Sequence, residues 1–211
     1  MEVIDFLFSQ YSEYSSTHII LELTAVVASV VSVLYSYRNS FLVFPFGIVS
    51  TAIFTYLLVN WNLLGDAVIN LYYLIMSIYG WYLWIKGGKN NTELQISLTS
   101  KQQWIRAITI SILAAFCIYI LYVSTNRMES VVSYIDMVTT GLFFAGMWLM
   151  AKRKLEHWLV LGIGNFISIP LYFYKGYTFS AFLYLFLLIM AVAGFYAWKK
   201  YLNNSIIKAS V

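Results

Sequence analysis

The stretch DAVINLYYLIMSIYGWYLWIK, residues 66–86, recurs later in the chain as SAFLYLFLLIMAVAGFYAWKK, residues 180–200. The two stretches lie 114 residues apart, and 9 of their 21 positions are identical. The identities include a glycine, a tyrosine and a tryptophan in addition to leucines. Leucines coincide in any two apolar helices, whereas shared glycine and aromatic positions do not, so we infer an internal duplication.

The composition places this duplication in a lipid bilayer. Of the 211 residues, 61% are hydrophobic and only 10% are charged, which leaves too little polar surface to coat a soluble domain. Apolar stretches of about 20 residues are long enough to cross the ~30 Å hydrocarbon core as helices. The sequence therefore predicts an all-α integral membrane protein. Its seven transmembrane helices are expected at residues 17–37, 41–60, 64–85, 104–123, 131–150, 158–174 and 179–198.

The 114-residue offset divides these helices into two units. It also pairs Glu22 with Asp136 and Arg38 with Lys152, whereas a shift of one residue sets Gly47 on Gly162. We expect a first triple-helix bundle with the N-terminal segment in residues 1–86, a polar connector and linker helix in 87–130, and a second triple-helix bundle in 131–211. Because four crossings separate the first and fifth helices, the bundles run in the same direction, as a 3+1+3 parallel repeat. Two equivalent bundles can expose a site between them to each side of a membrane in turn.

The basic residues predict the orientation of the chain. Eleven of the 13 lysines and arginines fall in the loops and the terminus on one side, and only Arg127 and Lys175 lie on the other. Loops rich in lysine and arginine stay in the cytoplasm, so we expect the N-terminus outside and the C-terminus in the cytoplasm. Membrane topology thus explains the net charge of +4 better than nucleic-acid binding does.

Two carboxylates lie inside the predicted spans, Glu22 in the first and Asp136 in the fifth. An ionisable group at this depth is costly and must face protein or water. Two interpretations stay open: each carboxylate attracts a cationic ligand or supports a ligand hydroxyl, or it brackets a neighbouring helix.

Polar side chains at membrane depth form a second group of candidates. Amides, hydroxyls and phenols there can bind a polar small molecule, and they can equally hold helices together. The group consists of Asn70, Tyr73, Asn165, Ser168, Tyr172 and Tyr184. Trp81 is added as an aromatic wall that could stack on a flat or cationic ring, with core packing as the alternative.

Other chemistries find little support in the sequence. His18 and His157 lie on different stretches and Cys117 is the single cysteine, so we expect no metal site. The chain has no phosphate-binding glycine loop and no clustered nucleophile and base, so we expect neither a cofactor nor an enzyme.

Several strings resemble one family over most of the chain. They are Glu22, FPFGI at 44–48, GDAVINLYYLIMSIYGWYLW at 65–84, Asp136, NFISIPLYFYKG at 165–176 and the pair Leu183-Tyr184. These strings are similar to those of the bacterial nicotinamide riboside transporters of the PnuC type. The resemblance implies a SWEET-like fold, a homotrimer and a bacterial cytoplasmic membrane. It also implies facilitated diffusion of a vitamin, which an intracellular kinase then traps by phosphorylation.

On this resemblance, the polar group and Trp81 would bind nicotinamide riboside, with Glu22 and Asp136 in support. The chain departs from the family at two places: Asn70 stands where we expect a glutamine, and Leu161 where a tryptophan is common. Relatives carry thiamine or riboflavin instead, so a thiamine transporter is the first alternative. A membrane receptor or scaffold that does not transport is the alternative from another class.

Overall fold

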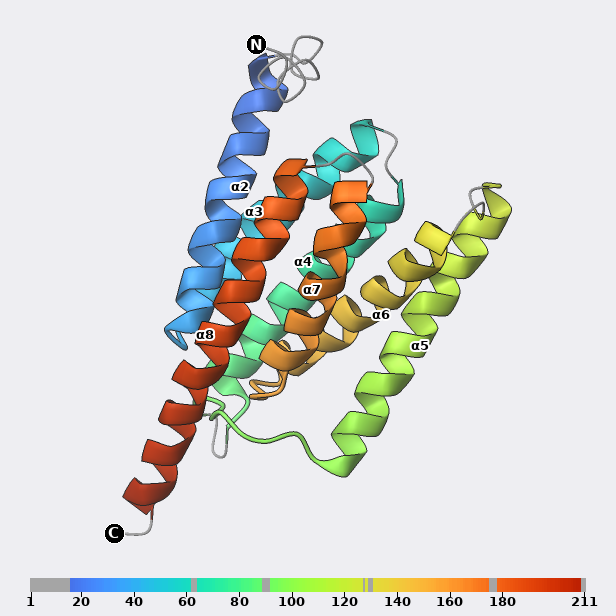
Figure 1. The fold of residues 1–211 in the computed structure, drawn as a ribbon. Coiled ribbons are helices and arrows are strands. Elements are labelled where there is room, and N and C mark those ends of the chain that lie inside the picture. The colour runs from blue at the N-terminus through green and yellow to red at the C-terminus, as the bar shows by residue number, and fades with distance from the viewer. Residues whose placement is uncertain are drawn as a thin grey trace.

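The computed structural model describes residues 16–61, 64–88, 92–126, 128, 131–174 and 178–209. The described residues form seven long helices (Figure 1). Each overlaps a predicted span, and all but the last begin and end within a few residues of it. The helices are α2 (Ser16–Tyr37), α3 (Val43–Asn60), α4 (Leu64–Lys86), α5 (Lys101–Ser124), α6 (Val131–Ala151), α7 (His157–Tyr174) and α8 (Thr178–Ala209). The last helix continues past the predicted end at Trp198, because a helix that leaves the membrane can carry polar residues such as Lys199 and Asn203 in water.

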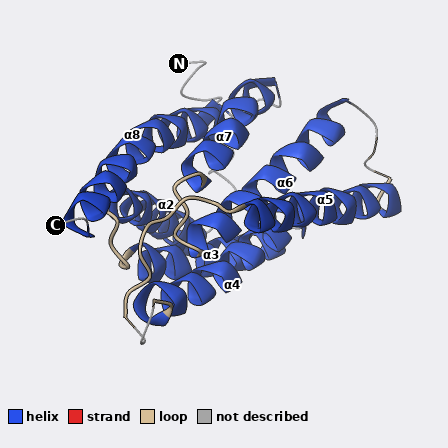
Figure 2. Ribbon diagram, turned by 90° about the horizontal axis from the view of Figure 1, so that it is seen from below, coloured by secondary structure: helices blue, strands red, loops and turns tan. Residues whose placement is uncertain are grey.

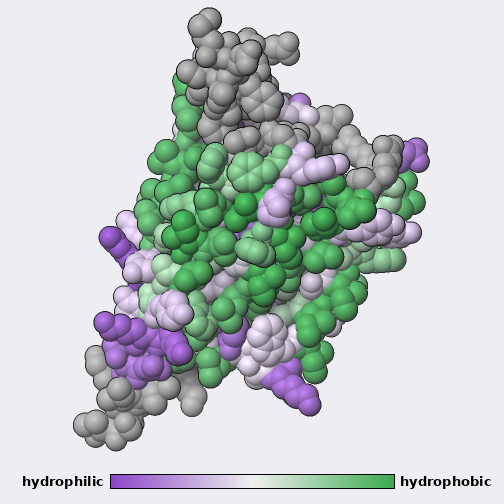
Figure 3. Space-filling model, in the orientation of Figure 1, coloured by the Kyte–Doolittle hydropathy of each residue, from purple (hydrophilic) through white to green (hydrophobic). Residues whose placement is uncertain are grey.

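The outer surface of these helices is apolar. Six of them, α2 to α6 and α8, are long and apolar enough to cross a membrane, and Figure 3 shows their hydrophobic side chains covering the middle of the molecule. The exception, α7, includes His157, Asn165, Ser168 and Pro170 within 18 residues. The chain is a multi-pass membrane protein whose α7 carries polar groups into the interior.

The helices pack in two groups with α5 at the side. In the first group α3 contacts both α2 and α4, and in the second α7 contacts both α6 and α8. Contacts of α4 with α6 and of α2 with α8 join the groups, while α5 packs against α6 (Figures 1 and 2). At the α4–α6 contact the Tyr72 and Phe144 rings stack 3.8 Å apart, and the Tyr72 hydroxyl donates to the Phe144 carbonyl over 3.0 Å.

The two groups share the 114-residue spacing in their boundaries. Helices α2 and α6 end 114 residues apart, α3 and α7 both begin and end 114 residues apart, and α4 and α8 begin 114 residues apart. The middle helices of the two groups, α3 and α7, are therefore separated by 114 residues and not by 115. The one-residue shift that aligns Gly47 with Gly162 in the sequence does not apply to the helix boundaries.

Two hydrogen bonds across the groups repeat the same spacing. Trp84 Nε1 donates to the Met150 carbonyl over 3.1 Å, and Trp198 Nε1 donates to the Ser36 carbonyl over 2.8 Å. Adding 114 to Trp84 gives Trp198, and subtracting it from Met150 gives Ser36. Both indoles are almost completely buried, so each bond satisfies an N–H group that would otherwise be costly to bury.

Glycines let an aromatic ring lie against a helix backbone in each group. The Phe44 ring lies over Gly80 and edge-on to Trp84, and the Trp158 ring lies over Gly194 and edge-on to Trp198. The centroid distances are 4.9 and 5.9 Å. These pairs, again 114 residues apart, explain why the sequence keeps glycine at both positions.

Replacing Gly194 with alanine is expected to destabilise the protein by about 1–3 kcal/mol, because overpacking a filled core forces its neighbours to shift. A Cβ at residue 194 would lie 2.5 Å from ring carbons of Trp158. Gly162→Ala is the matched control, since its Cβ would meet the Ala191 Cβ at 3.4 Å. Thermal unfolding of the two variants in detergent checks the prediction, and equal melting temperatures would contradict it.

The polar connector crosses one end of the bundle (Figure 2). The Ser97 amide donates to the Arg153 carbonyl, and the Leu155 amide donates to the Ser97 carbonyl. The Thr99 hydroxyl donates to a Glu156 carboxylate oxygen over 2.6 Å. We call this end, where α2, α4 and α6 finish and α7 starts, the basic end.

Arg153 joins the first group, the second group and the connector at the basic end. Its guanidinium donates to the Asn39 side chain over 2.9 Å and to the Leu94 carbonyl, and it lies over the Trp84 ring. Burial lowers the pKa of Arg153, and the nearby Glu93 carboxylate opposes that shift. Asn39 and Arg153, 114 residues apart, both have positive φ values, of 56° and 52°.

Candidate functional site

A cavity of about 790 Å³ lies between the two helix groups. Side chains from all six helices of the groups line it, and α5 contributes residues at one end. Among the lining residues are seven that the sequence singles out, namely Asn70, Tyr73, Asp136, Asn165, Ser168, Tyr172 and Tyr184. The structure therefore brings the polar group predicted from the sequence into one space.

Helix α7 supplies the polar wall of this cavity. Leu161, Asn165, Ser168 and Tyr172 recur every three or four residues, so they share one face of the helix. Asn165 is 5% exposed and Ser168 is 1% exposed, although both line the cavity. The Ser168 hydroxyl has no hydrogen-bond partner among the described residues, which leaves it available to a ligand.

Aromatic side chains from three helices form a second wall. The Tyr184 ring of α8 lies 4.8 Å from the Tyr172 ring of α7 and stacks at 6.0 Å on the Phe143 ring of α6. Gly164 makes room for Phe143, because a Cβ there would lie 2.7 Å from that ring. Ring faces of this kind suit a flat aromatic or cationic ligand.

The two intramembrane carboxylates differ in position. Asp136 lines the cavity, and the Tyr122 hydroxyl of α5 donates to its Oδ2 over 3.4 Å. Glu22 is half-buried in α2 and is absent from the cavity lining. Asp136 thus both bonds to α5 and faces the cavity. The position of Glu22 does not support direct contact with a ligand in the cavity.

Trp81 lies outside the cavity, contrary to the aromatic wall expected from the sequence. Its side chain is 36% exposed, and it is not among the lining residues. The inward face of α4 runs through Asn70, Tyr73 and Ser77 and continues at Gly80. Trp81 follows Gly80 by one residue, which turns it about 100° away from that face.

Hydroxyl groups on the first helix group line the cavity although the sequence did not single them out. Ser29, Ser32 and Ser36 line it from α2, at a spacing of three and four residues that places them on one helix face. This spacing is the feature of the sequence that could have identified the three serines. Ser32 Oγ donates to the Val43 carbonyl over 2.7 Å, and Thr51 Oγ1 donates to the Gly47 carbonyl over 2.7 Å. These two hydroxyls therefore also hydrogen-bond to the backbone of α3.

A layer of aromatic side chains closes the cavity at the basic end. Phe44, Trp84, Trp158 and Trp198 belong to one buried cluster, and Phe44 and Trp158 also line the cavity. His157 is completely buried beside this layer, with its Nδ1 2.6 Å from the Lys154 carbonyl. Toward the opposite end, the lining reaches Thr125, which is exposed.

The groups that line the cavity are suited to binding a small polar molecule. Within the described ranges, no three histidine, cysteine, aspartate or glutamate side chains group closely enough to hold a metal ion. The cavity instead offers an amide wall, an aromatic wall and one carboxylate.

A family model described as nicotinamide mononucleotide transporter matches residues 19–200. The chain belongs to the nicotinamide mononucleotide transporter family. Its fold is also similar to that in a crystal structure of the vitamin B3 transporter PnuC, with a TM-score of 0.65 and 22% sequence identity. That similarity covers 93% of this chain and 88% of the other. The PnuC-type resemblance inferred from the sequence strings is thereby confirmed.

Two positions distinguish this member of the nicotinamide mononucleotide transporter family from the pattern we expected. Asn70 stands in place of a glutamine and Leu161 in place of a tryptophan, and both line the cavity. Leu161 packs over Gly146, where an added Cβ would collide with it. The departures therefore lie where they can alter the shape of a binding site.

Proposed function

We propose that this transporter carries nicotinamide riboside across the cytoplasmic membrane by facilitated diffusion, with the cavity between the two helix groups as its binding site. The single observation that carries the proposal is the convergence of Asn70, Tyr73, Asn165, Ser168, Tyr172 and Tyr184 on that cavity. Its volume of about 790 Å³ lies within the range of small-molecule sites, roughly 300–1,000 Å³.

The chemistry of the walls fits such a ligand. A pyridinium ring is flat and cationic, so Tyr172, Tyr184 and Phe143 can bind its face by stacking and cation–π attraction. Asp136 adds a negative charge to the cavity. Asn165 and Ser168 can bind ribose hydroxyls or a carboxamide, since an amide and a hydroxyl both donate and accept hydrogen bonds.

The transport step uses the two helix groups as the two units of a SWEET-like 3+1+3 parallel repeat with seven spans, α7 included. The shared helix boundaries and the paired bonds of Trp84 and Trp198 support this repeat. Rocking one unit against the other would expose the cavity to each side in turn. Because both tryptophan bonds link the two units near the basic end, we expect opening at that end to break them.

The orientation follows from the basic end. Arg38, Lys86 and Lys152 lie at or just beyond the ends of α2, α4 and α6 there, and Lys199 lies on α8 directly after the predicted span; Figure 3 shows hydrophilic side chains at this end. The basic end faces the cytoplasm, so the N-terminus is outside. The family resemblance further supports a homotrimer in a bacterial cytoplasmic membrane and trapping of the released vitamin by an intracellular kinase.

Uptake of labelled nicotinamide riboside into proteoliposomes without an ion gradient tests the mechanism. We expect saturable uptake that stops at equal concentrations inside and outside, because a uniporter only equilibrates its substrate. Proteoliposomes that contain the Asn165→Ala variant are the matched control. A strict requirement for a proton or sodium gradient would contradict facilitated diffusion.

Thiamine is the second candidate substrate, favoured by the two departures at Asn70 and Leu161 in the cavity. Thiamine is also an aromatic cation, so the same walls could bind it. Competition between the two vitamins for one purified sample separates the candidates: the true substrate displaces the other at the lower concentration. Counterflow across liposomes distinguishes either transporter from a receptor or scaffold, which would exchange nothing.

A further inference from the structure

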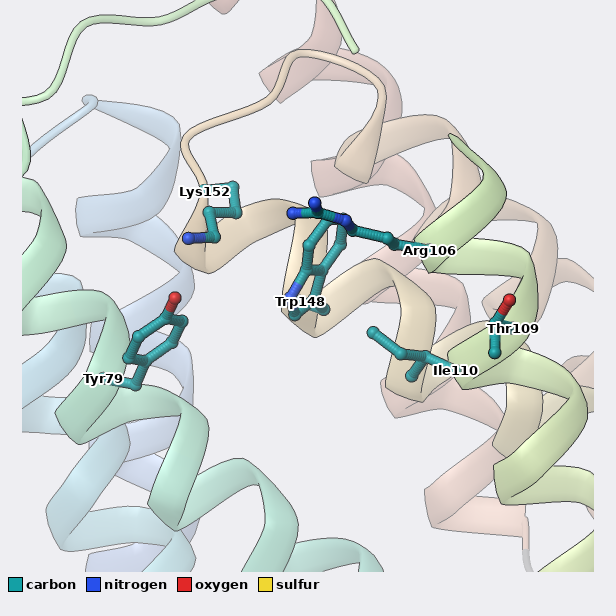
Figure 4. A pocket seen from close by; sticks show the side chains of 6 residues that line it. All are labelled: Tyr79, Arg106, Thr109, Ile110, Trp148 and Lys152. Atoms are coloured by element: carbon teal, nitrogen blue, oxygen red, sulfur yellow. The ribbon is translucent and has the colours of Figure 1, made fainter. Parts of the chain in front are cut away.

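A second pocket opens on the outer side of the helices near the basic end. It has a volume of about 340 Å³ and lies between α4, α5 and α6 (Figure 4). Its lining consists of Tyr79, Arg106, Thr109, Ile110, Trp148 and Lys152. None of these residues lines the cavity between the helix groups, so the proposed transport function leaves this pocket unexplained.

Two cations from different elements line the pocket. Arg106 projects from the first turns of α5 toward Trp148, and Lys152 follows the end of α6 (Figure 4). Among the residues that the structure describes, no aspartate or glutamate lines this pocket. Across the part of the chain that the structure describes, neither cation is within ion-pair distance of a carboxylate. The pocket is therefore a site of unbalanced positive charge.

Aromatic and aliphatic groups form the rest of the pocket. Lys152 Nζ lies 5.1 Å from the centroid of the Tyr79 ring, and Trp148 lies between the walls (Figure 4). Ile110 continues the lining on α5. Tryptophan and tyrosine prefer the level of lipid headgroups, where one part of the ring meets hydrocarbon and the other meets water.

The position of the pocket identifies the chemistry of its occupant. It lies near the start of α5 and the end of α6, and Figure 3 shows an apolar outer surface meeting hydrophilic side chains at this end of the bundle. A ligand there must be anionic at one end to meet Arg106 and Lys152. It must also tolerate hydrocarbon, since α4 and α5 expose large apolar side chains such as Ile75 and Leu113. An anionic phospholipid has both properties, whereas a free phosphate ion has only the first.

We propose that this pocket binds the phosphate-bearing headgroup of an anionic phospholipid from the leaflet at the basic end. Basic pockets between transmembrane helices on the cytoplasmic side bind such headgroups. Because its lining comes from α4, α5 and α6, the bound lipid ties α5 to both helix groups. The proposal requires only that the chain spans a membrane and does not depend on the identity of the transported vitamin.

Native mass spectrometry of the full-length protein in neutral detergent tests the site. We titrate the protein with phosphatidylglycerol, with phosphatidylcholine and with inorganic phosphate. The expected result is one phosphatidylglycerol adduct that persists at concentrations where phosphatidylcholine adducts are lost. Equal retention of the two lipids would overturn the proposal, and so would inorganic phosphate that displaces phosphatidylglycerol at an equal concentration.

Charge-removal variants locate the adduct. Each cation near an anionic lipid surface is worth about a 5-fold change in affinity, so Arg106→Gln with Lys152→Gln is expected to weaken phosphatidylglycerol binding about 25-fold. Lys199→Gln with Lys200→Gln removes the same charge from exposed residues of α8 and is expected to leave binding unchanged. Arg106→Lys keeps the positive charge and should retain most of the phosphatidylglycerol binding.

Two results would overturn the assignment to this pocket. One is full phosphatidylglycerol binding by the Arg106→Gln, Lys152→Gln variant, and the other is an equal loss in the Lys199→Gln, Lys200→Gln control. Uptake by the pocket variant in phosphatidylcholine liposomes separates this proposal from the transport function. Nicotinamide riboside uptake that persists there while lipid binding is lost supports both.

Discussion

Replacing Asn165 with alanine is expected to weaken nicotinamide riboside binding by about 1–3 kcal/mol, which is roughly 5- to 150-fold in the dissociation constant. The amide is 5% exposed and lines the cavity. Its removal therefore leaves a polar group of the bound ligand without a partner where water cannot easily replace it. Isothermal titration of the purified protein measures the change.

Asn60→Ala is the control for this substitution. Asn60 lies at the end of α3, is exposed, and donates its side-chain N–H to the Tyr56 carbonyl over 2.8 Å. It lies outside the cavity lining, so its loss should leave the dissociation constant unchanged. An unaltered affinity in the Asn165→Ala protein would remove this residue from the site.

Replacing Trp198 with phenylalanine is expected to lower the free energy of unfolding by about 1–3 kcal/mol, because the buried Ser36 carbonyl loses its hydrogen-bond donor. Trp84→Phe should cost a similar amount, since Trp84 makes the corresponding bond to Met150. Thermal unfolding in detergent measures both changes. Trp104→Phe, at an exposed residue of α5, is the control.

The two substitutions also test the repeat itself. If the helix groups are equivalent units, then removing either tryptophan bond weakens the same contact between them, and the losses should agree within a factor of two. A large loss in one variant beside none in the other would contradict the equivalence of the two bonds.

The sequence predicted the helices well because each is encoded locally. An apolar run of about 20 residues identifies a span regardless of its neighbours, and all seven observed helices lie at predicted stretches. The end of α8 was missed, because the polar residues after Trp198 end the apolar run without ending the helix. The 114-residue offset anticipated the matching helix boundaries and the paired positions of Trp84 and Trp198.

The candidate site was predicted in part, and the errors have a geometric cause. The polar character of Asn165 and Ser168 inside a predicted span indicated that they face the interior, since an amide or hydroxyl at membrane depth must face protein or a cavity. It could not distinguish Asp136, which lines the cavity, from Glu22, which occupies the same repeat position but does not. It also could not exclude Trp81, because one residue of helical rotation separates its outward position from the inward Gly80.

The outer pocket could not have been predicted from the sequence. Arg106 and Lys152 read as ordinary loop-flanking cations, and only the packing of α5 beside α6, with α4 across the groove, brings them to one pocket. The serines of α2 could have been found from their spacing of three and four residues. The spacing alone does not separate serines that line a cavity from serines that only hydrogen-bond to a helix backbone, because that depends on which helices the fold places beside them.

A structure of the protein with nicotinamide riboside bound is the most direct test of the claim that the vitamin lies between two equivalent helix groups. We expect ligand density in the cavity of about 790 Å³, with the ring against Tyr172 and Tyr184 and a polar group within hydrogen-bond distance of Asn165. Density elsewhere on the molecule, or an empty cavity at a saturating concentration of the vitamin, would contradict it.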